Sequence, residues 1–232
     1  MFQTFAKYLL LNPRFTLATL RLALKLHNMI YVLCSVLAVG ANGGVHPKHR
    51  LLSYKEWFLD HVETNWCVLD IGSNTGAMPA LLAEKAEYVY GVEIDPRLSE
   101  IARCSNSGRN VEFLTGDATT FDFSGCRPID CVTLSNVLEH IRDRGSFLRS
   151  LLSRLPWRDV RHRVFLIRVP TIERDWLSAY KKEVGVDYRL DRTHEIEHTR
   201  HELVAELEAA GLAIANFEVR FGEYYVVCRG TL

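Results

Sequence analysis

The first 55 residues of this 232-residue chain contain no acidic residue at all. Seven lysines and arginines lie in that segment, and the first carboxylate of the chain is Glu56. The whole chain carries 28 basic and 28 acidic residues, so its formal net charge is zero. The lack of an overall basic surplus argues against a dedicated nucleic-acid-binding protein. The basic front segment, in contrast, predicts contact with an anionic surface or partner.

The sequence also lacks paired cysteines and a cleavable signal. Its six cysteines are scattered, with no Cys-x-x-Cys pair among them. The apolar run near the N-terminus comes late and has no cleavage site after it, unlike a secretory signal peptide. Free thiols are typical of a reducing compartment, so we expect a cytoplasmic protein.

Residues 1–50 are predicted to form a helical appendage. Asn12-Pro13 is typical of a helix start, and Arg14, Arg21 and Lys25 fall on one face of the helix that follows. The uncharged run from Met29 to Gly40 is shorter than the ~20 residues that span a bilayer. We therefore expect this segment to lie peripherally at the inner face of a membrane or to contact a partner, rather than to cross. Packing against the rest of the chain, or a homo-oligomer formed through these helices, remains open.

From residue 51 to residue 232, apolar runs alternate with amphipathic ones, which predicts one α/β domain with a mostly parallel sheet. The last two apolar runs, 213–220 and 224–229, are joined by only three residues and must form an antiparallel hairpin. The five earlier strands are expected at 67–71, 88–93, 111–114, 129–134 and 164–169.

Acidic residues follow three consecutive strands of this predicted sheet. Asp70 precedes a turn that contains Gly72 and Gly76, Glu93 ends the second strand, and Asp117 follows the third. The carboxyl ends of parallel strands meet at one edge of the sheet, so the three acids are expected along one crevice. A carboxylate in the place of Glu93 suits the hydroxyls of a ribose.

The stretch from Val68 to His140 resembles the class I S-adenosylmethionine-dependent methyltransferases, especially the group that methylates small molecules. The resemblance implies a Rossmann-like seven-stranded sheet and S-adenosylmethionine as cofactor. It places Asp70, Gly72 and Gly76 around the methionine end, Glu93 at the ribose, Asp117 with Ala118 at the adenine, and Asn136 facing the cofactor. The implied cofactor-binding residues are Asp70, Gly72, Ser73, Asn74, Gly76, Glu93, Ile94, Asp117, Ala118 and Asn136.

Two details bear on this resemblance. Asn74 stands where the family often has glycine, and asparagine tolerates a left-handed backbone better than most residues. A nicotinamide-dependent dehydrogenase of the same fold would carry Gly-x-Gly-x-x-Gly, which the first strand-to-helix turn lacks.

Histidines are the candidate catalytic residues, because transfer of a methyl group to oxygen benefits from a base near neutral pH. His140 is the first candidate, since it follows the fourth strand, and His194 and His198 come next. These last two also complete a His-Glu-x-x-His pattern, but a zinc protease needs that pattern within a helix. The sequence instead predicts a helix that starts at Thr199, so we expect no metal ligands there, although metal-assisted methyl transfer stays open.

The acceptor is expected to be a hydroxyl of a sugar, a lipid-linked intermediate or another small metabolite. The fourth-strand motif lacks the Asn/Asp-Pro-Pro-Tyr signature of enzymes that methylate amino groups of nucleic acids, and the neutral charge agrees. The alternative is a non-catalytic module that keeps the cofactor fold and associates with a membrane or a partner.

Overall fold

The computed structural model describes residues 13–106 and 110–231. The chain divides into two compact units. The larger comprises Ser53–Thr171 and Asp191–Leu232, and the smaller comprises Met1–Leu52 and Ile172–Leu190. The boundary expected near residue 51 stays a prediction, and no local sequence pattern indicates that residues 172–190 group with the N-terminal helix.

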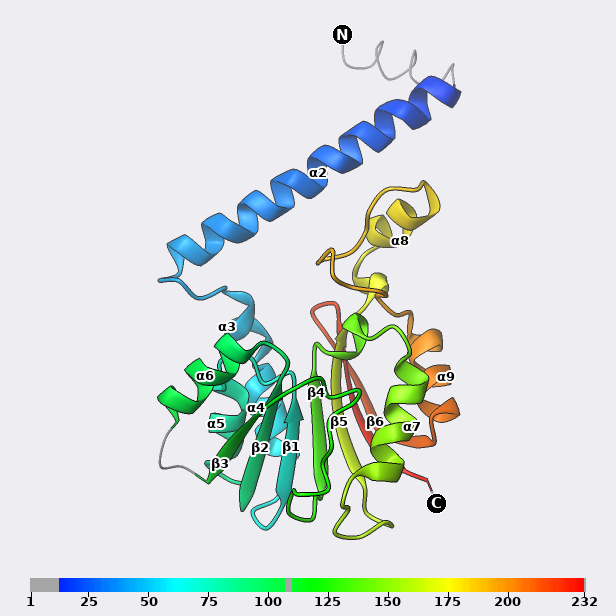
Figure 1. Ribbon diagram of the computed structural model, residues 1–232. Coiled ribbons are helices and arrows are strands. Elements are labelled where there is room, and N and C mark those ends of the chain that lie inside the picture. Colours follow the sequence, from blue (N-terminus) through cyan, green and yellow to red (C-terminus); the bar gives the residue numbers. More distant parts are fainter. Residues whose placement is uncertain (1–12, 107–109, 232) are drawn as a thin grey trace. The chain divides into compact units, whose positions relative to one another are not determined.

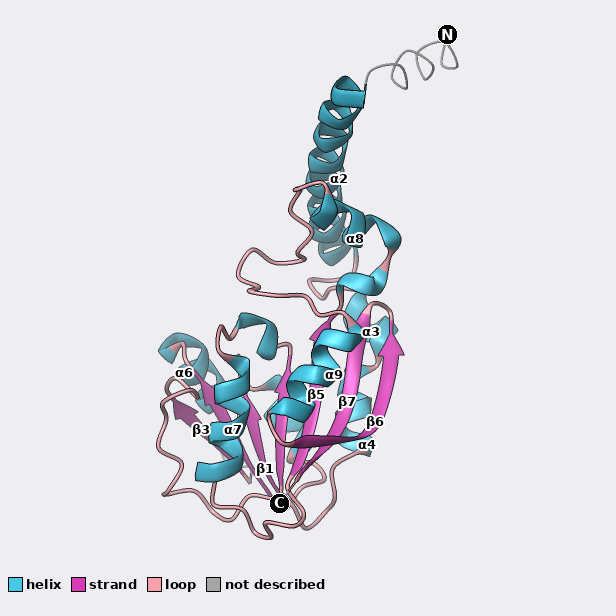
Figure 2. Cartoon of the chain, turned by 90° about the vertical axis from the view of Figure 1, so that its right-hand side faces the viewer, coloured by secondary structure: helices cyan, strands magenta, loops and turns pink. Residues whose placement is uncertain are grey.

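The larger unit is built on one seven-stranded sheet with the strand order β3-β2-β1-β4-β5-β7-β6 (Figures 1 and 2). All neighbours are parallel except β7, which runs antiparallel to β5 and to β6. The predicted mostly parallel sheet that ends in a hairpin is confirmed. The strands are β1 (Cys67–Ile71), β2 (Tyr88–Glu93), β3 (Val111–Thr115), β4 (Cys131–Ser135), β5 (Val164–Pro170), β6 (Leu212–Arg220) and β7 (Glu223–Gly230).

Helices cover both faces of this sheet, so alternate residues of each central strand enter two different cores. Leu69 of β1 belongs to the core beneath α7 and α9, whereas Val68 belongs to the core beneath α4 and α5 (Figure 1). All five residues of β1 are buried, as expected of a central parallel strand. The helices of this unit are α4 (Tyr54–Asp60), α5 (Ala77–Leu82), α6 (Pro96–Ser105), a short 3-10 helix η1 (Leu138–His140), α7 (Arg144–Arg154) and α9 (Arg200–Ala209).

Local sequence signals set where two of these helices begin. Asp95 caps α6 by accepting a hydrogen bond from Arg97 N at 2.8 Å, with Pro96 in the first helical position. Thr199 and Glu202 form the predicted capping box of α9. Because α9 starts after His198, the His-Glu-x-x-His pattern lies outside any helix, as the sequence predicts.

A buried ion pair joins β5 to the antiparallel strand β7. The guanidinium of Arg168 donates to both carboxylate oxygens of Glu223, at 2.6 and 2.9 Å, and both side chains are buried. The ring of Tyr54 lies 4.1 Å from the guanidinium carbon. The pair therefore satisfies two charges that would each be costly to bury alone.

The smaller unit consists of α2 (Pro13–Ala41), α3 (Lys48–Leu52), a 3-10 helix η2 (Ile172–Arg174) and α8 (Trp176–Glu183). Leu24 is the buried residue of α2, and it packs with Val184 and Val186. Arg21 Nε donates to Val184 O and Asn28 Nδ2 donates to Asp187 O, each at 2.7 Å. One side of the helix is thus fixed to the segment that follows α8.

The length of α2 corrects one expectation from the sequence. The helix is continuous over 29 residues, and its most apolar 18-residue window has a mean hydropathy of 1.7 with 6% of that window buried. By length and composition alone the whole helix could therefore cross a membrane, although core helices and signal sequences meet the same criterion.

Removal of one partner of the β5–β7 ion pair tests its contribution to stability. We expect Glu223→Ala to lower the free energy of unfolding by about 3–5 kcal/mol, because Arg168 would be left charged and unpaired in the interior. Chemical denaturation would measure the change, and Glu208→Ala, at an exposed position of α9, is the control and should shift it by less than about 0.5 kcal/mol. An unfolding curve for Glu223→Ala that matches the control would contradict this account.

Candidate functional site

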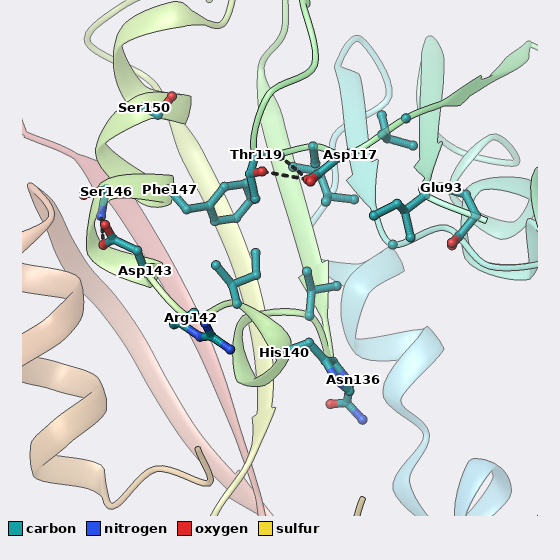
Figure 3. A pocket seen from close by; sticks show the side chains of 18 residues that line it. Glu93, Asp117, Thr119, Asn136, His140, Arg142, Asp143, Ser146, Phe147 and Ser150 are labelled. Carbon is teal, nitrogen blue, oxygen red and sulfur yellow. Dashed lines mark hydrogen bonds between the residues drawn. The ribbon is translucent and has the colours of Figure 1, made fainter. Parts of the chain in front are cut away.

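A cavity of about 830 Å³ opens at the carboxyl ends of β1, β2, β3 and β4 (Figure 3). This is the edge where open parallel sheets bind ligands, and the volume lies in the range of small-molecule sites. Most of the lining comes from residues that directly follow one of the four strands, and the rest comes from α7. The lining residues are Ile71, Gly72, Val92, Glu93, Ile94, Gly116, Asp117, Ala118, Thr119, Asn136, Val137, His140, Ile141, Arg142, Asp143, Ser146, Phe147 and Ser150.

The turn after β1 depends on glycine at the cavity wall. Gly72 has a φ of +76°, and a Cβ added there would lie 2.7 Å from Val137 Cγ2. Its backbone N–H donates to Val92 O at 2.8 Å and so fastens the turn to β2. Asn74 adopts a φ of +50°, the left-handed conformation that the sequence led us to expect of it. The turn therefore brings bare backbone to the cavity.

Glu93 holds this turn in place and also lines the cavity. Its Oε2 accepts a hydrogen bond from Asn74 N at 2.8 Å, and its Oε1 accepts one from Asp95 N at 2.9 Å. The residue is 7% exposed. Each carboxylate oxygen has a second lone pair, so the group can still accept hydrogen bonds from ligand hydroxyls.

Asp70 lies next to the cavity rather than in its lining. Its carboxyl is fully buried, and Oδ1 accepts a 2.5 Å hydrogen bond from Thr133 Oγ1 on β4. Burial raises the pKa of Asp70 to about 7, against the opposing effect of the Thr133 hydrogen bond, and the nearby charge of Glu93 raises it further. Three acids were expected along the crevice; Glu93 and Asp117 line the cavity, whereas Asp70 is buried and does not.

The predicted cofactor residues thus fall into two groups. Gly72, Glu93, Ile94, Asp117, Ala118 and Asn136 line the cavity. Asp70, Ser73, Asn74 and Gly76 instead belong to the strand end and the turn that shape it.

Two buried polar atoms beside this turn fit a polar ligand. Ser73 Oγ and Asn136 Oδ1 have no hydrogen-bond partner within the described part of the chain. Buried polar groups are normally satisfied, so such atoms mark a place where a ligand completes the pairing. Asn136 also has a φ of +57° at the end of β4, which is uncommon for a residue other than glycine. The amide oxygen accepts and the hydroxyl can donate or accept, so the two atoms suit a ligand that carries hydrogen-bond donors.

The sequence analysis did not predict that residues after His140 would line the cavity. Ile141, Arg142 and Phe147 contribute to the wall, and Figure 3 shows Phe147 across from His140. Phe147 belongs to an apolar stripe of α7 whose spacing predicts only core packing. The one sequence signal that Phe147 could line a site was its position in the first turn of a helix that begins near the edge of the sheet.

The three candidate catalytic histidines occupy different surroundings. His140 lines the cavity, and its ring lies 4.9 Å from that of His194. Partial burial and the neighbouring His194 lower the pKa of His140, so this imidazole is neutral at pH 7. His198 is fully buried, with Nε2 3.6 Å from Glu206 Oε1, and it is not among the lining residues. The structure thus brings His140 and His194 together, and a catalytic role for His198 stays a prediction.

Glu139 joins the two neighbouring histidines in a group that offers metal ligands. One ligand atom each from Glu139, His140 and His194 lies within 4.8 Å of the others. Burial raises the pKa of Glu139 to about 7, while the charges of His194 and Arg168 lower it. This set shares only His194 with the His-Glu-x-x-His pattern.

Comparisons with known proteins agree with the geometry. Residues 69–155 match the model of a methyltransferase domain family. The chain is 26% identical over 155 residues to the ubiquinone biosynthesis O-methyltransferase of Aeromonas salmonicida, covering 63% of each chain. It is 42% identical over 62 residues to a ribosomal RNA small subunit methyltransferase A of Rubrobacter xylanophilus, covering 26% of this chain and 24% of that one. The chain spans 42% or less of the length of the first curated relatives that it matches.

Solved structures share the fold. Magnesium protoporphyrin IX methyltransferase of Synechocystis, determined with bound S-adenosylhomocysteine, superposes with a TM-score of 0.58 at 19% identity, over 79% of this chain and 83% of that chain. The family match covers the first four strands and the loops that form the cavity. Residues 69–155 therefore match a methyltransferase domain, and the larger unit has the fold of solved S-adenosylmethionine-dependent methyltransferases.

Proposed function

We propose that this protein transfers the methyl group of S-adenosylmethionine to a hydroxyl of a small or lipid-linked acceptor. The observation that carries the proposal is the cavity at the ends of β1–β4, where Glu93 lies beside a glycine turn and His140 lies in the same lining. Binding of the cofactor along this edge leaves the side that contains His140 and Arg142 for the acceptor.

The reaction is an in-line displacement at the methyl carbon. A lone pair of the acceptor oxygen forms the new O–C bond as the C–S bond breaks, and the bonding pair stays on sulfur to give neutral S-adenosylhomocysteine. The acceptor proton is released to water. Alignment of the two reactants supplies most of the acceleration, which binding of both in one cavity favours. We propose that His140 and His194 belong to the group that activates the acceptor oxygen.

The charge of the chain and the names of its relatives favour a small acceptor. The longest alignment given above is to an O-methyltransferase named for ubiquinone biosynthesis, and it covers 63% of this chain. Other relatives act on ribosomal RNA or on ribosomal protein L11 by their names, and those alignments cover 32% of the chain or less. The net charge of zero provides no general attraction to RNA. A small acceptor is therefore favoured over a macromolecular one.

A non-catalytic module is the second candidate from a different class. It would bind the cofactor in the same cavity and show no turnover with any acceptor. The His140–His194 pair beside the cavity favours the enzyme, because a module that only binds the cofactor has no need of imidazoles at the acceptor side.

We also propose that α2 attaches the protein peripherally to the inner face of an anionic membrane. Since Arg21, Leu24 and Asn28 contact the segment that follows α8, residues 29–41 remain for lipid, about 20 Å of helix. Met29, Leu33, Val36 and Leu37 in that stretch are 55–69% exposed. Lys and Arg near the helix would each add about 1 kcal/mol of attraction to an anionic surface.

Substitution of Glu93 tests the cofactor assignment. We expect Glu93→Ala to weaken binding of S-adenosylhomocysteine about tenfold or more, because hydrogen bonds from ribose hydroxyls to a carboxylate are worth about 1.5–3 kcal/mol. Titration calorimetry would measure the dissociation constants, with Glu84→Ala, exposed just after α5, as the control. Equal affinities in wild type and Glu93→Ala would refute this role of Glu93.

Substitution of His140 tests the acceptor side. Once a screen with labelled S-adenosylmethionine has identified an acceptor, His140→Ala should lower kcat by about 100-fold or more. The dissociation constant of the cofactor should change little, because the ring lies on the acceptor side. The exposed His201→Ala on α9 is the control and should retain wild-type kcat. Wild-type kcat in His140→Ala would remove this residue from the reaction.

Flotation with liposomes tests the membrane proposal. The full-length protein should float with anionic vesicles at low salt, less so at high salt and not with neutral vesicles. Leu33→Glu combined with Leu37→Glu should abolish flotation, whereas the control Val160→Glu, 55% exposed in the larger unit, should not. Absence of the wild-type protein from the anionic vesicles would end the proposal, and resistance to alkaline extraction would show a crossing helix instead.

A further inference from the structure

Three potential ligands meet where the loop 191–199 passes η1. Glu139 and His140 end η1, and His194 lies in the loop, with their ligand atoms within 4.8 Å of one another. The rings of His140 and His194 are inclined by 76°. A backbone hydrogen bond from Glu195 N to Glu139 O, at 2.7 Å, fixes the loop against η1. The cluster is therefore held by main chain as well as by side chains.

The carboxyl of Glu139 lacks the pairing that its burial demands. The residue has no exposed surface, and neither Oε1 nor Oε2 has a hydrogen-bond partner among the residues that the structure describes. An ionised carboxylate in such a place costs several kcal/mol unless a cation meets it. The orphaned carboxyl is a second observation, independent of the spacing of the cluster, that indicates a bound cation.

The hydrogen bonds of His140 determine which ring nitrogen holds its proton. Thr193 Oγ1 donates its one proton to Asp191 Oδ1 at 2.8 Å, so it can only accept from His140 Nδ1, 3.1 Å away. The carbonyl oxygen of Thr193, 3.4 Å from the same nitrogen, is also an acceptor. Nδ1 of His140 is therefore protonated, and the lone pair resides on Nε2.

His194 is oriented in the same way by a carboxylate. Its Nδ1 lies 3.1 Å from Glu197 Oε1, and Glu197 is fully buried. Donation from Nδ1 to that oxygen places the lone pair of His194 on Nε2. Metal-binding histidines almost always donate their other N–H to a carboxylate or carbonyl in this manner, which fixes the tautomer and increases the basicity of the ligand.

We propose that Glu139, His140 and His194 bind one divalent transition-metal ion beside the cofactor cavity. Two imidazoles and one carboxylate suit Mn²⁺, Fe²⁺, Co²⁺ or Zn²⁺ better than Mg²⁺, which prefers oxygen ligands. Three protein ligands also leave coordination positions for substrate or water, as in catalytic metal sites.

The place of the ion follows from His140, which both joins this cluster and lines the cavity. An ion there would polarise an acceptor oxygen and ease the loss of its proton to water. This consequence rests on the proposed methyl transfer, whereas binding of the ion does not. The two can therefore be tested separately.

Titration of the full-length, chelator-treated protein with Co²⁺ tests the site without any assay of activity. One Co²⁺ per chain should bind and give visible absorption typical of nitrogen and oxygen ligands, and Zn²⁺ should displace it. Glu139→Gln keeps the size of the side chain and removes its charge, so it should weaken binding by about tenfold or more. Glu197→Gln should weaken binding in the same direction, because it acts through the orientation of His194. The control His201→Asn should bind as wild type does.

Titration of the same variants with S-adenosylhomocysteine separates the possible outcomes. Glu139→Gln that retains the cofactor and loses Co²⁺ supports the site and excludes misfolding as the cause. Wild-type protein that binds S-adenosylhomocysteine and no Co²⁺, or Glu139→Gln with wild-type Co²⁺ affinity, overturns the metal site and leaves the proposed function standing. Co²⁺ binding without methyl transfer to any acceptor supports the site and counts against the proposed function.

Discussion

The pairing of β1 with β2 on one side and with β4 on the other decides where this molecule can bind a ligand. The chain proceeds outward from β1 to β3 and then returns to β4 on the opposite side of β1. The loops that follow β1 and β4 therefore diverge, and a crevice opens between them at the carboxyl ends of the strands. The cavity, the glycine turn and η1 all lie at this edge because of that strand order.

Buried charge is concentrated at the same edge. Asp70 and Glu139 are carboxyl groups whose pKa burial raises to about 7; Asp70 lies in β1, and Glu139 lies in η1, which follows the neighbouring parallel strand β4. Arg168 and Glu223, in contrast, neutralise each other between β5 and β7. The acid of the ion pair is satisfied within the fold, whereas Glu139 has no such partner among the described residues. This unpaired carboxyl is the observation on which the proposed cation site rests.

Much of the fold could be predicted from the sequence, because its signals are local. Strands β1 and β2 were predicted with the bounds that the structure gives, and the capping box at Thr199 located the start of α9. The glycine turn and Glu93 were also predicted as part of the site, since each depends on a strand end and on the backbone conformation beside it. Such features need no knowledge of distant contacts.

The remainder depends on contacts between residues far apart in the chain. Nothing near Glu139 in the sequence indicates that His194 lies beside it, because a loop that follows α8 brings the two together. The grouping of residues 172–190 with α2 likewise rests on Leu24, Val184 and Val186, which no local pattern connects. The expectation that this segment is too short to span a bilayer counted only the uncharged run 29–40, whereas the spanning criterion applies to the whole helix Pro13–Ala41.

A structure of the protein with S-adenosylhomocysteine bound is the most direct test of the central claim, that the strand-end crevice is a methyltransferase site. The account predicts ribose hydroxyls within hydrogen-bond distance of the Glu93 carboxylate, the adenine beside Asp117 and Ala118, and the sulfur on the side of the cavity that contains His140. A ligand bound elsewhere, or one in the cavity whose ribose does not contact Glu93, would contradict it.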